Sequence, residues 1–214
     1  MADGPDGGAL MKIALIVEGK TEKAFIPYLR EYLQKHLPGA MPKLDIHPYD
    51  GRIPKGDKLR RVVTNHLEGK NSADHVIALT DVYTGTTPAD FQNAADAKTQ
   101  MRAWVGDVPQ FHPHAAQYDF EAWLLPYWPK IQKLAGHNKK VPAGCPESVN
   151  HDNPPARHIK EIFAVGSCRG HYVKPRDAAR ILRENDLSIA VEQCPELKAL
   201  VNTILDACGG ALIP

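Results

Sequence analysis

The hydrophobic pattern predicts buried strands that alternate with amphipathic helices. A continuous apolar run, Ile13 to Val17, is typical of a strand covered on both faces, and apolar positions at helical spacing follow from about Thr21 to His36. His75 to Thr80 is a second buried run. Between them, Lys43 to Tyr49 alternates as an edge strand does, and Pro48 argues against a central position. We therefore expect an α/β fold around a mostly parallel sheet flanked by helices.

The rest of the pattern predicts one more strand and several helices. A short strand is expected from Phe111 to about Gln117, and a helix begins near Asp119. A polar segment rich in Pro and Gly, residues 136–155, is expected to be a functional or mobile loop. The remaining helices are predicted at residues 59–67, 88–105, 156–165, 175–184 and 195–207.

This order divides the chain into three parts. Residues 1–11 are expected to be a disordered N-terminal segment, residues 12–135 an α/β core, and residues 136–214 a loop plus a helical extension packed on that core. With 214 residues, 43% of them hydrophobic, the chain can form one sizeable core.

Composition and charge exclude several classes of protein. A formal charge of +1 does not suit a generally basic nucleic-acid coat, so a polyanion site must come from local clusters of cations. We find no signal peptide and no apolar run long enough for a membrane span, and we expect a cytoplasmic protein. The four cysteines contain no C-x-x-C pair and are expected to be reduced, mostly buried thiols.

Carboxylates follow the buried strands at the point where each strand ends. Glu18 comes directly after the first strand and Asp81 after the second. Asp119 and Glu121 follow the last strand; for either acid alone, the plainer explanation is an acid that complements a helix N-terminus. Because the carboxyl ends of parallel strands share one edge, these acids would repel one another unless a cation neutralised them. Oxygen ligands of this kind suit Mg²⁺ or Mn²⁺.

Two basic segments could bind phosphates. Residues 51–61 carry five cations against one acid, and a solvated face and a phosphate-binding loop are both open interpretations. A second basic region includes Arg157, Lys160 and Lys174, for which a solvated helix face is equally open. Gly19-Lys20-Thr21 looks like the end of a P-loop, but the first glycine of that motif would fall at Ala14 and Glu18 would face the phosphates, so we reject a P-loop.

Three short motifs together carry a family resemblance. Val17-Glu18-Gly19-Lys20-Thr21-Glu22 and Leu79-Thr80-Asp81-Val82-Tyr83 resemble the Toprim (Rossmann-like) domain of topoisomerases, primases and OLD-type nucleases. With the Tyr-x-x-Glu-Ala-x-Leu pattern at residues 118–124, the order is similar to small uncharacterised bacterial Toprim-like proteins that are often associated with ATPases in defence loci. The resemblance covers most of the chain from Lys12 onward.

The resemblance implies roles for individual residues. Glu18 would be an acid/base or metal-positioning group, Asp81 the leading metal ligand, and Glu22 the second glutamate of the OLD-like version. The chain departs from the usual Asp-x-Asp because Tyr83 stands two residues after Asp81, and we expect Glu121, with Asp119, to supply the missing carboxylate. Lys174 would contact the scissile phosphate. The expected contacts to the rest of the nucleic acid are Lys20, Arg52, Lys55, Lys58, Arg157 and Lys160.

The function implied by the resemblance is a Mg²⁺- or Mn²⁺-dependent nuclease. DNA is favoured over RNA as the substrate, with an ABC- or AAA-type ATPase as partner and phage defence as the setting, and a homo-oligomer is open. Two alternatives remain: a catalytically weak module that binds nucleic acid or a partner subunit, and an enzyme that processes mononucleotides.

Overall fold

Parallel strands form the central sheet of the protein, whose computed structural model describes residues 10–83, 86–149, 153–168 and 170–214. Nearly all of the predicted N-terminal segment, residues 1–11, lies outside these ranges. Within them the sheet has the order β2-β1-β3-β4, and every pair of neighbours is parallel. The strands are β1 (Lys12–Val17), β2 (Lys43–Pro48), β3 (His75–Asp81) and β4 (Phe111–Ala116). The α/β prediction is confirmed, with β1 central and β2 at an edge.

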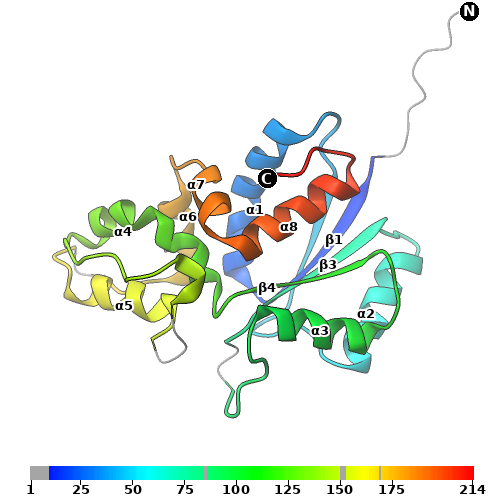
Figure 1. Ribbon diagram of the computed structural model, residues 1–214, viewed down its shortest axis with the longest axis horizontal. Helices are drawn as coiled ribbons and strands as arrows, with labels where there is room; N and C mark the ends of the chain where they lie inside the picture. Colours follow the sequence, from blue (N-terminus) through cyan, green and yellow to red (C-terminus); the bar gives the residue numbers. More distant parts are fainter. Residues whose placement is uncertain (1–9, 84–85, 150–152, 169) are drawn as a thin grey trace, which may run out of the picture.

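Helices cover both faces of this sheet because the side chains of β1 alternate between two hydrophobic clusters. Ile13, Leu15 and Val17 pack with α1 (Lys20–His36) and α8 (Pro195–Ala207). Ala14 and Ile16 pack on the other face, which α2 (Asp57–Glu68) and α3 (Ala94–Val105) cover. Figure 1 shows these two helical layers on either side of the strands. A strand buried on both faces explains the continuous apolar run in the sequence.

The remaining helices lie beside α1 and α8 (Figure 1). Phe25 on α1, Trp123 and Ile181 belong to the same hydrophobic cluster, so the core continues from the sheet into this part of the chain. The elements in this part of the chain are η1 (Phe120–Tyr127), α4 (Trp128–Ala135), η2 (Pro146–Ser148), α5 (Pro155–Val165), α6 (Lys174–Leu182) and α7 (Ser188–Gln193). No helix in the described ranges is long and apolar enough to span a bilayer.

Several local predictions were wrong. The helix expected from Pro88 begins only at Ala94, where the Asn93 side chain accepts a hydrogen bond from the Asp96 amide (2.9 Å) and so fixes the start. The helix expected near Asp119 is a 3₁₀ helix, and α4 and α7 were not predicted. The thiols are not mostly buried: Cys194 is buried and Cys208 partly so, whereas the other two, Cys145 and Cys168, are exposed.

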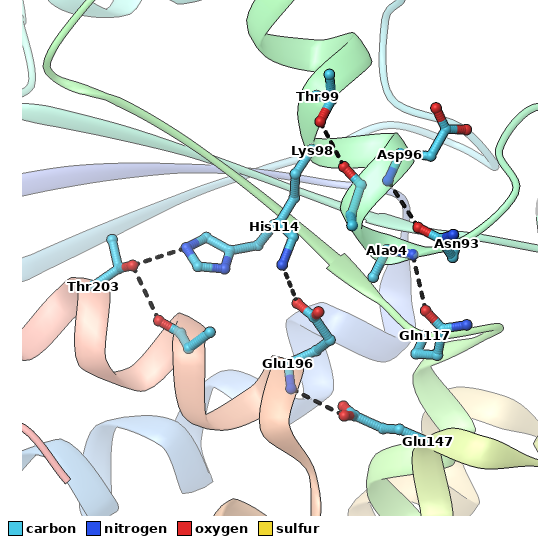
Figure 2. Close-up of polar contacts among 12 residues, drawn as sticks. Asn93, Ala94, Asp96, Lys98, Thr99, His114, Gln117, Glu147, Glu196 and Thr203 are labelled. Atoms are coloured by element: carbon cyan, nitrogen blue, oxygen red, sulfur yellow. Dashed lines mark hydrogen bonds and ion pairs between the residues drawn. The ribbon is translucent and has the colours of Figure 1, made fainter. Parts of the chain in front are cut away.

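Polar contacts fix α8 against the sheet and the polar loop (Figure 2). The hydroxyl of Thr203 lies 3.0 Å from Nε2 of His114 on β4, and Lys98 on α3 forms an ion pair with Glu196 (2.6 Å). The backbone amide of Glu196 donates to Oε2 of Glu147 (3.0 Å), which places a carboxylate at the N-terminus of α8. The end of the chain is thereby tied to β4, α3 and η2.

Candidate functional site

The first part of the site lies where β1 and β3 end side by side. The register pairs Val17 with Leu79, so Glu18 stands beside Thr80 and Asp81. Oε1 of Glu18 accepts a hydrogen bond from the Thr80 hydroxyl and another from the Asp81 amide (3.0 Å). Glu18 is 8% exposed and Asp81 is half-buried. Two strand-end acids predicted from the sequence therefore lie together, and Thr80, to which we assigned no role, orients one of them.

Glu22 joins this pair through the start of α1. Its Oε2 accepts a hydrogen bond from the Gly19 amide (3.0 Å), as in a capping box, and the side chain is buried. One helical turn separates Glu22 from Glu18, so both acids lie at the helix N-terminus, where the helix dipole favours negative charge. The capping contact fixes Glu22 in the site rather than in solvent.

The η1 turn after β4 contributes the buried Glu121. Its side chain is 0% exposed; Oε1 accepts from the Tyr172 hydroxyl (3.1 Å) and Oε2 from the Lys174 ammonium (3.0 Å). A buried carboxylate is stable only when its oxygens are paired in this way. Glu121 does lie in the first turn of a helix, as the plainer explanation requires, but its carboxylate is buried and bound to Tyr172 and Lys174.

Asp119 lies just before η1 and has one unpaired oxygen. Oδ2 accepts from the amide of Ala156 in the first turn of α5 (3.2 Å). Oδ1 is buried and has no hydrogen-bond partner within the described residues. A buried acceptor without a donor is rare in folded proteins, and such an oxygen can bind a cation or a water molecule.

Lys174 is a cation that lies among five acids. We call these acids the acidic cluster: Glu18, Glu22, Asp81, Asp119 and Glu121. Besides its bond to Glu121, its ammonium interacts electrostatically with Asp81 and Asp119 and more weakly with the two acids beside β1. Burial alone would lower the pKa of Lys174, but these charges raise it above its ordinary value. The structure thus brings together the predicted acids and the lysine that lies 53 positions after Glu121.

Burial and the charges of neighbouring acids raise the pKa values of Glu18, Glu22, Asp81 and Asp119. Burial raises the pKa of Glu18 to about 7, and the charge of Glu22 adds to the effect. The pKa of Asp119 is raised to about 8 by burial and by Glu121. Burial and then Glu18 hold the pKa of Asp81 well above its usual range. One lysine does not offset this concentration of negative charge, so a further cation would be stabilising.

The donors of the acidic cluster suit a hard divalent cation. Among the described residues, no group of three or more His, Cys, Asp or Glu side chains is arranged to hold a metal ion. Mg²⁺, however, is usually held by only one or two carboxylates, with water and substrate phosphates completing its shell. Glu18 and Asp81 provide such a pair, and Oδ1 of Asp119 is a further oxygen without a donor. The residues present therefore fit Mg²⁺ or Mn²⁺ in chemical type.

A basic loop lies next to this edge of the sheet. The Gly51 amide donates to the backbone oxygen of Glu18 (3.1 Å), which fixes the loop after β2 beside the acidic cluster. Arg52 and Lys58 line an open cavity of about 590 Å³ there. Lys55 also lines it but forms an ion pair with Asp90 (2.5 Å). Three of the predicted phosphate contacts thus line one cavity, and their contact with nucleic acid stays a prediction.

The other predicted phosphate contacts lie on helix surfaces. Arg157 is exposed on α5 and forms an ion pair with Glu161 (3.1 Å), and Lys160 is exposed on the same helix. Lys20 is exposed at the start of α1. In the part of the chain that the structure describes, no ion pair joins these three cations to the acidic cluster. Their contact with nucleic acid stays a prediction.

Comparisons with known proteins identify a family but no activity. No curated protein matches the chain. Among solved structures, the chain is similar to the C-terminal region of the Burkholderia pseudomallei OLD protein, with a TM-score of 0.48 and 14% identity over 92% of this chain and 98% of that chain. A family model described as "Domain of unknown function (DUF4276)" matches residues 17–205. Since that match spans most of the chain, the protein belongs to the DUF4276 family.

Proposed function

We propose that the protein is a metal-dependent phosphodiester hydrolase that acts on DNA or RNA. The observation that carries the proposal is the acidic cluster at the carboxyl edge of a parallel sheet, with Lys174 in its midst and a basic loop beside it. This edge is where open α/β sheets bind their ligands. The Toprim-like motifs described above support the same activity.

Glu18 and Asp81 are the residues that would hold a Mg²⁺ or Mn²⁺ ion. When bound, such an ion stabilises the negative charge that develops on the attacking and leaving oxygens. Thr80 keeps the Glu18 carboxylate turned toward Asp81. Asp119 and Glu121 add negative charge around that place, and Glu22 fixes the first turn of α1 through its cap.

Lys174 would bind the phosphate that is cleaved. Its side chain is 39% exposed, so the ammonium can contact a substrate from where it stands. If it shifted toward a phosphate, Glu121 would keep the hydrogen bond from Tyr172 and would not be left without any donor. Arg52 and Lys58 would then hold neighbouring phosphates of the strand, which gives affinity without sequence preference.

A binding module without catalysis is the second candidate. The Lys174 to Glu121 pair already neutralises one acid, and Tyr83 stands where the resembled enzymes have a second aspartate. A protein with these features could bind nucleic acid or a partner subunit through the same surface. We propose an ATPase partner and a role in phage defence for either candidate function, because both rest only on the resemblance of the sequence motifs.

Cleavage assays test the proposal. End-labelled single-stranded DNA, duplex DNA and RNA are incubated with the protein in Mg²⁺, Mn²⁺ or EDTA, with mononucleotides as a separate substrate. We expect metal-dependent cutting of a polymer that falls about 100-fold or more in Glu18→Gln and Asp81→Asn. Glu31→Gln, an exposed acid elsewhere on α1, is the matched control and should cut like the wild type.

Three results would count against metal-dependent hydrolysis of a polymer at the acidic cluster. Cutting that persists in EDTA or in both variants would contradict a role for the acidic cluster. Binding without cutting would favour the binding module. Activity on mononucleotides alone would favour a nucleotide-processing enzyme.

A further inference from the structure

A second cavity lies away from the acidic cluster, between α4, α5 and α6. Its volume is about 390 Å³, at the lower end of the range for small-molecule sites. Lys130 and Lys133 on α4 and Arg176 and Arg180 on α6 line it. Arg176 comes two residues after Lys174, so the two side chains leave α6 in different directions.

The cavity carries a net positive charge. None of its lining residues is acidic. Arg176 and Arg180 share the buried carboxylate of Asp177 (2.8 and 3.0 Å), which leaves the three groups with one positive charge. Nζ of Lys130 lies 3.3 Å from Oε2 of Glu184, whose side chain is 77% exposed. Within the described residues no carboxylate pairs with Lys133. An anion would therefore meet preorganised guanidinium groups, which suit phosphate geometry.

Apolar side chains form part of the cavity wall. Leu134, Ala135 and Phe163 line the cavity together with the charged side chains. A site for inorganic phosphate alone would not need this wall or this volume. We propose that the cavity binds a nucleoside phosphate, with the phosphate at Lys133, Arg176 and Arg180 and the nucleoside against Leu134 and Phe163. The ligand is either a free nucleotide or the phosphorylated end of a nucleic-acid strand.

The cavity shares its wall with the segment that carries Tyr172 and Lys174. The ring of Phe163 packs on that of Tyr172, with centroids 5.6 Å apart, and the Tyr172 hydroxyl donates to Glu121. Arg176 donates to the backbone oxygen of His171 (3.2 Å). A ligand held by Arg176 and Phe163 would therefore also fix residues 171–174 against the acidic cluster. Binding itself does not depend on hydrolysis at that cluster.

Binding is measured by calorimetry on the whole protein in EDTA, with inorganic phosphate, AMP, and a short DNA strand with or without a 5′-phosphate. We expect AMP, the phosphorylated strand, or both to bind at least about tenfold tighter than inorganic phosphate. AMP binding identifies a free nucleotide as the ligand. A strand that binds only with its 5′-phosphate, together with no AMP binding, identifies a strand end.

Variants separate this cavity from other cations. Lys133→Glu changes an exposed side chain and should weaken binding at least about tenfold, whereas Lys35→Glu, at the far end of α1, should leave it unchanged. Because EDTA removes the metal ion on which the proposed hydrolase depends, this binding test is separate from that of the hydrolase. The proposal is overturned if no phosphate compound binds, if phosphate binds as tightly as AMP and the strand, or if Lys133→Glu binds like the wild type.

Discussion

The ammonium of Lys174 donates a 3.0 Å hydrogen bond to the carboxylate of Glu121, a side chain that is completely buried. The two residues come from different elements, since Lys174 begins α6 and Glu121 lies in η1. The pair joins the start of α6 to the turn that follows β4. It also supplies the positive charge closest to the acidic cluster, so it affects both the stability and the chemistry of the site.

Replacing Lys174 with methionine should destabilise the protein. Glu121 would remain buried with Tyr172 as its donor, and the acidic cluster would lose its cation. Removal of one partner from a fully buried pair costs about 3–5 kcal/mol. Because Lys174 is 39% exposed, we expect a smaller loss, about 2 kcal/mol, in urea unfolding at pH 7.5.

The double variant Glu121→Gln with Lys174→Met is the control for this effect. It removes the uncompensated charge and should recover part of the lost stability, giving a clear coupling energy between the two positions. Additive effects of the two single substitutions would show that the pair is not coupled.

The raised pKa values of Glu18, Glu22, Asp81 and Asp119 predict that stability falls as pH rises. Folding holds the carboxyl groups of Glu18 and Asp119 protonated up to pH values of about 7 and 8, whereas the unfolded chain releases these protons near pH 4. The folded state thus binds more protons between these limits, and the free energy of unfolding decreases with pH there. Each of the two groups lowers the free energy of unfolding by about 1.4 kcal/mol per pH unit until its folded pKa is reached, so we expect a loss of several kcal/mol between pH 5 and pH 8 without metal, measured by urea unfolding.

Asp81→Asn tests the origin of this slope. It removes a carboxyl group whose own pKa is raised by burial and by Glu18, so the metal-free variant should lose less stability than the wild type over the same pH range. Asp96→Asn is the control. Hydrogen bonds lower the pKa of the Asp96 carboxyl, so its removal should not reduce the loss of stability with rising pH. Equal slopes in the wild type and Asp81→Asn would contradict the prediction.

The positions of Glu18 and Asp81 could be predicted because they follow from a simple rule. Each acid comes directly after a continuous apolar run, and parallel strands end at one edge of the sheet. The burial of Glu121 could not be predicted in the same way. An acid in the first turn of a helix usually faces solvent, and only contacts with Tyr172 and Lys174, far along the chain, fix it inside the protein.

The elements that the sequence missed are short. The apolar residues of α4 and α7 cover too few turns to form a clear helical period, and η1 has the tighter period of a 3₁₀ helix. The polar segment after α4, residues 136–155, was expected to be a functional or mobile loop. Val149 nevertheless joins the core and Glu147 bonds both to α8 and to Trp123, because tertiary contacts decide such positions.

Replacing Thr80 with valine should weaken the orientation of Glu18. The substitution keeps the shape of a buried side chain but removes the hydroxyl that donates to Glu18, at an expected loss of about 1 kcal/mol. Thr80→Ser keeps the donor and should retain more of the thermal shift that Mn²⁺ produces. If valine and serine variants respond equally to Mn²⁺, the hydroxyl does not orient the site.

Replacing Glu147 with alanine should loosen the attachment of α8. Its two carboxylate oxygens accept from the Glu196 amide at the start of α8 and from Nε1 of Trp123 (3.0 and 2.9 Å). Loss of a capping group and a buried hydrogen bond should reduce stability by about 1–2 kcal/mol in urea unfolding. Glu184→Ala, an exposed acid, is the matched control and should change stability far less. An equal effect of the two variants would contradict this role of Glu147.

The central claim is that the acidic cluster binds a divalent cation, and titration of Mn²⁺ followed by electron paramagnetic resonance tests it most directly. The wild type should remove free Mn²⁺ from solution, Mg²⁺ should compete, and Asp81→Asn should lose most of this binding while Glu31→Gln retains it. Mn²⁺ binding that is equal in Asp81→Asn and the wild type, or no binding by the folded wild type, would contradict the claim.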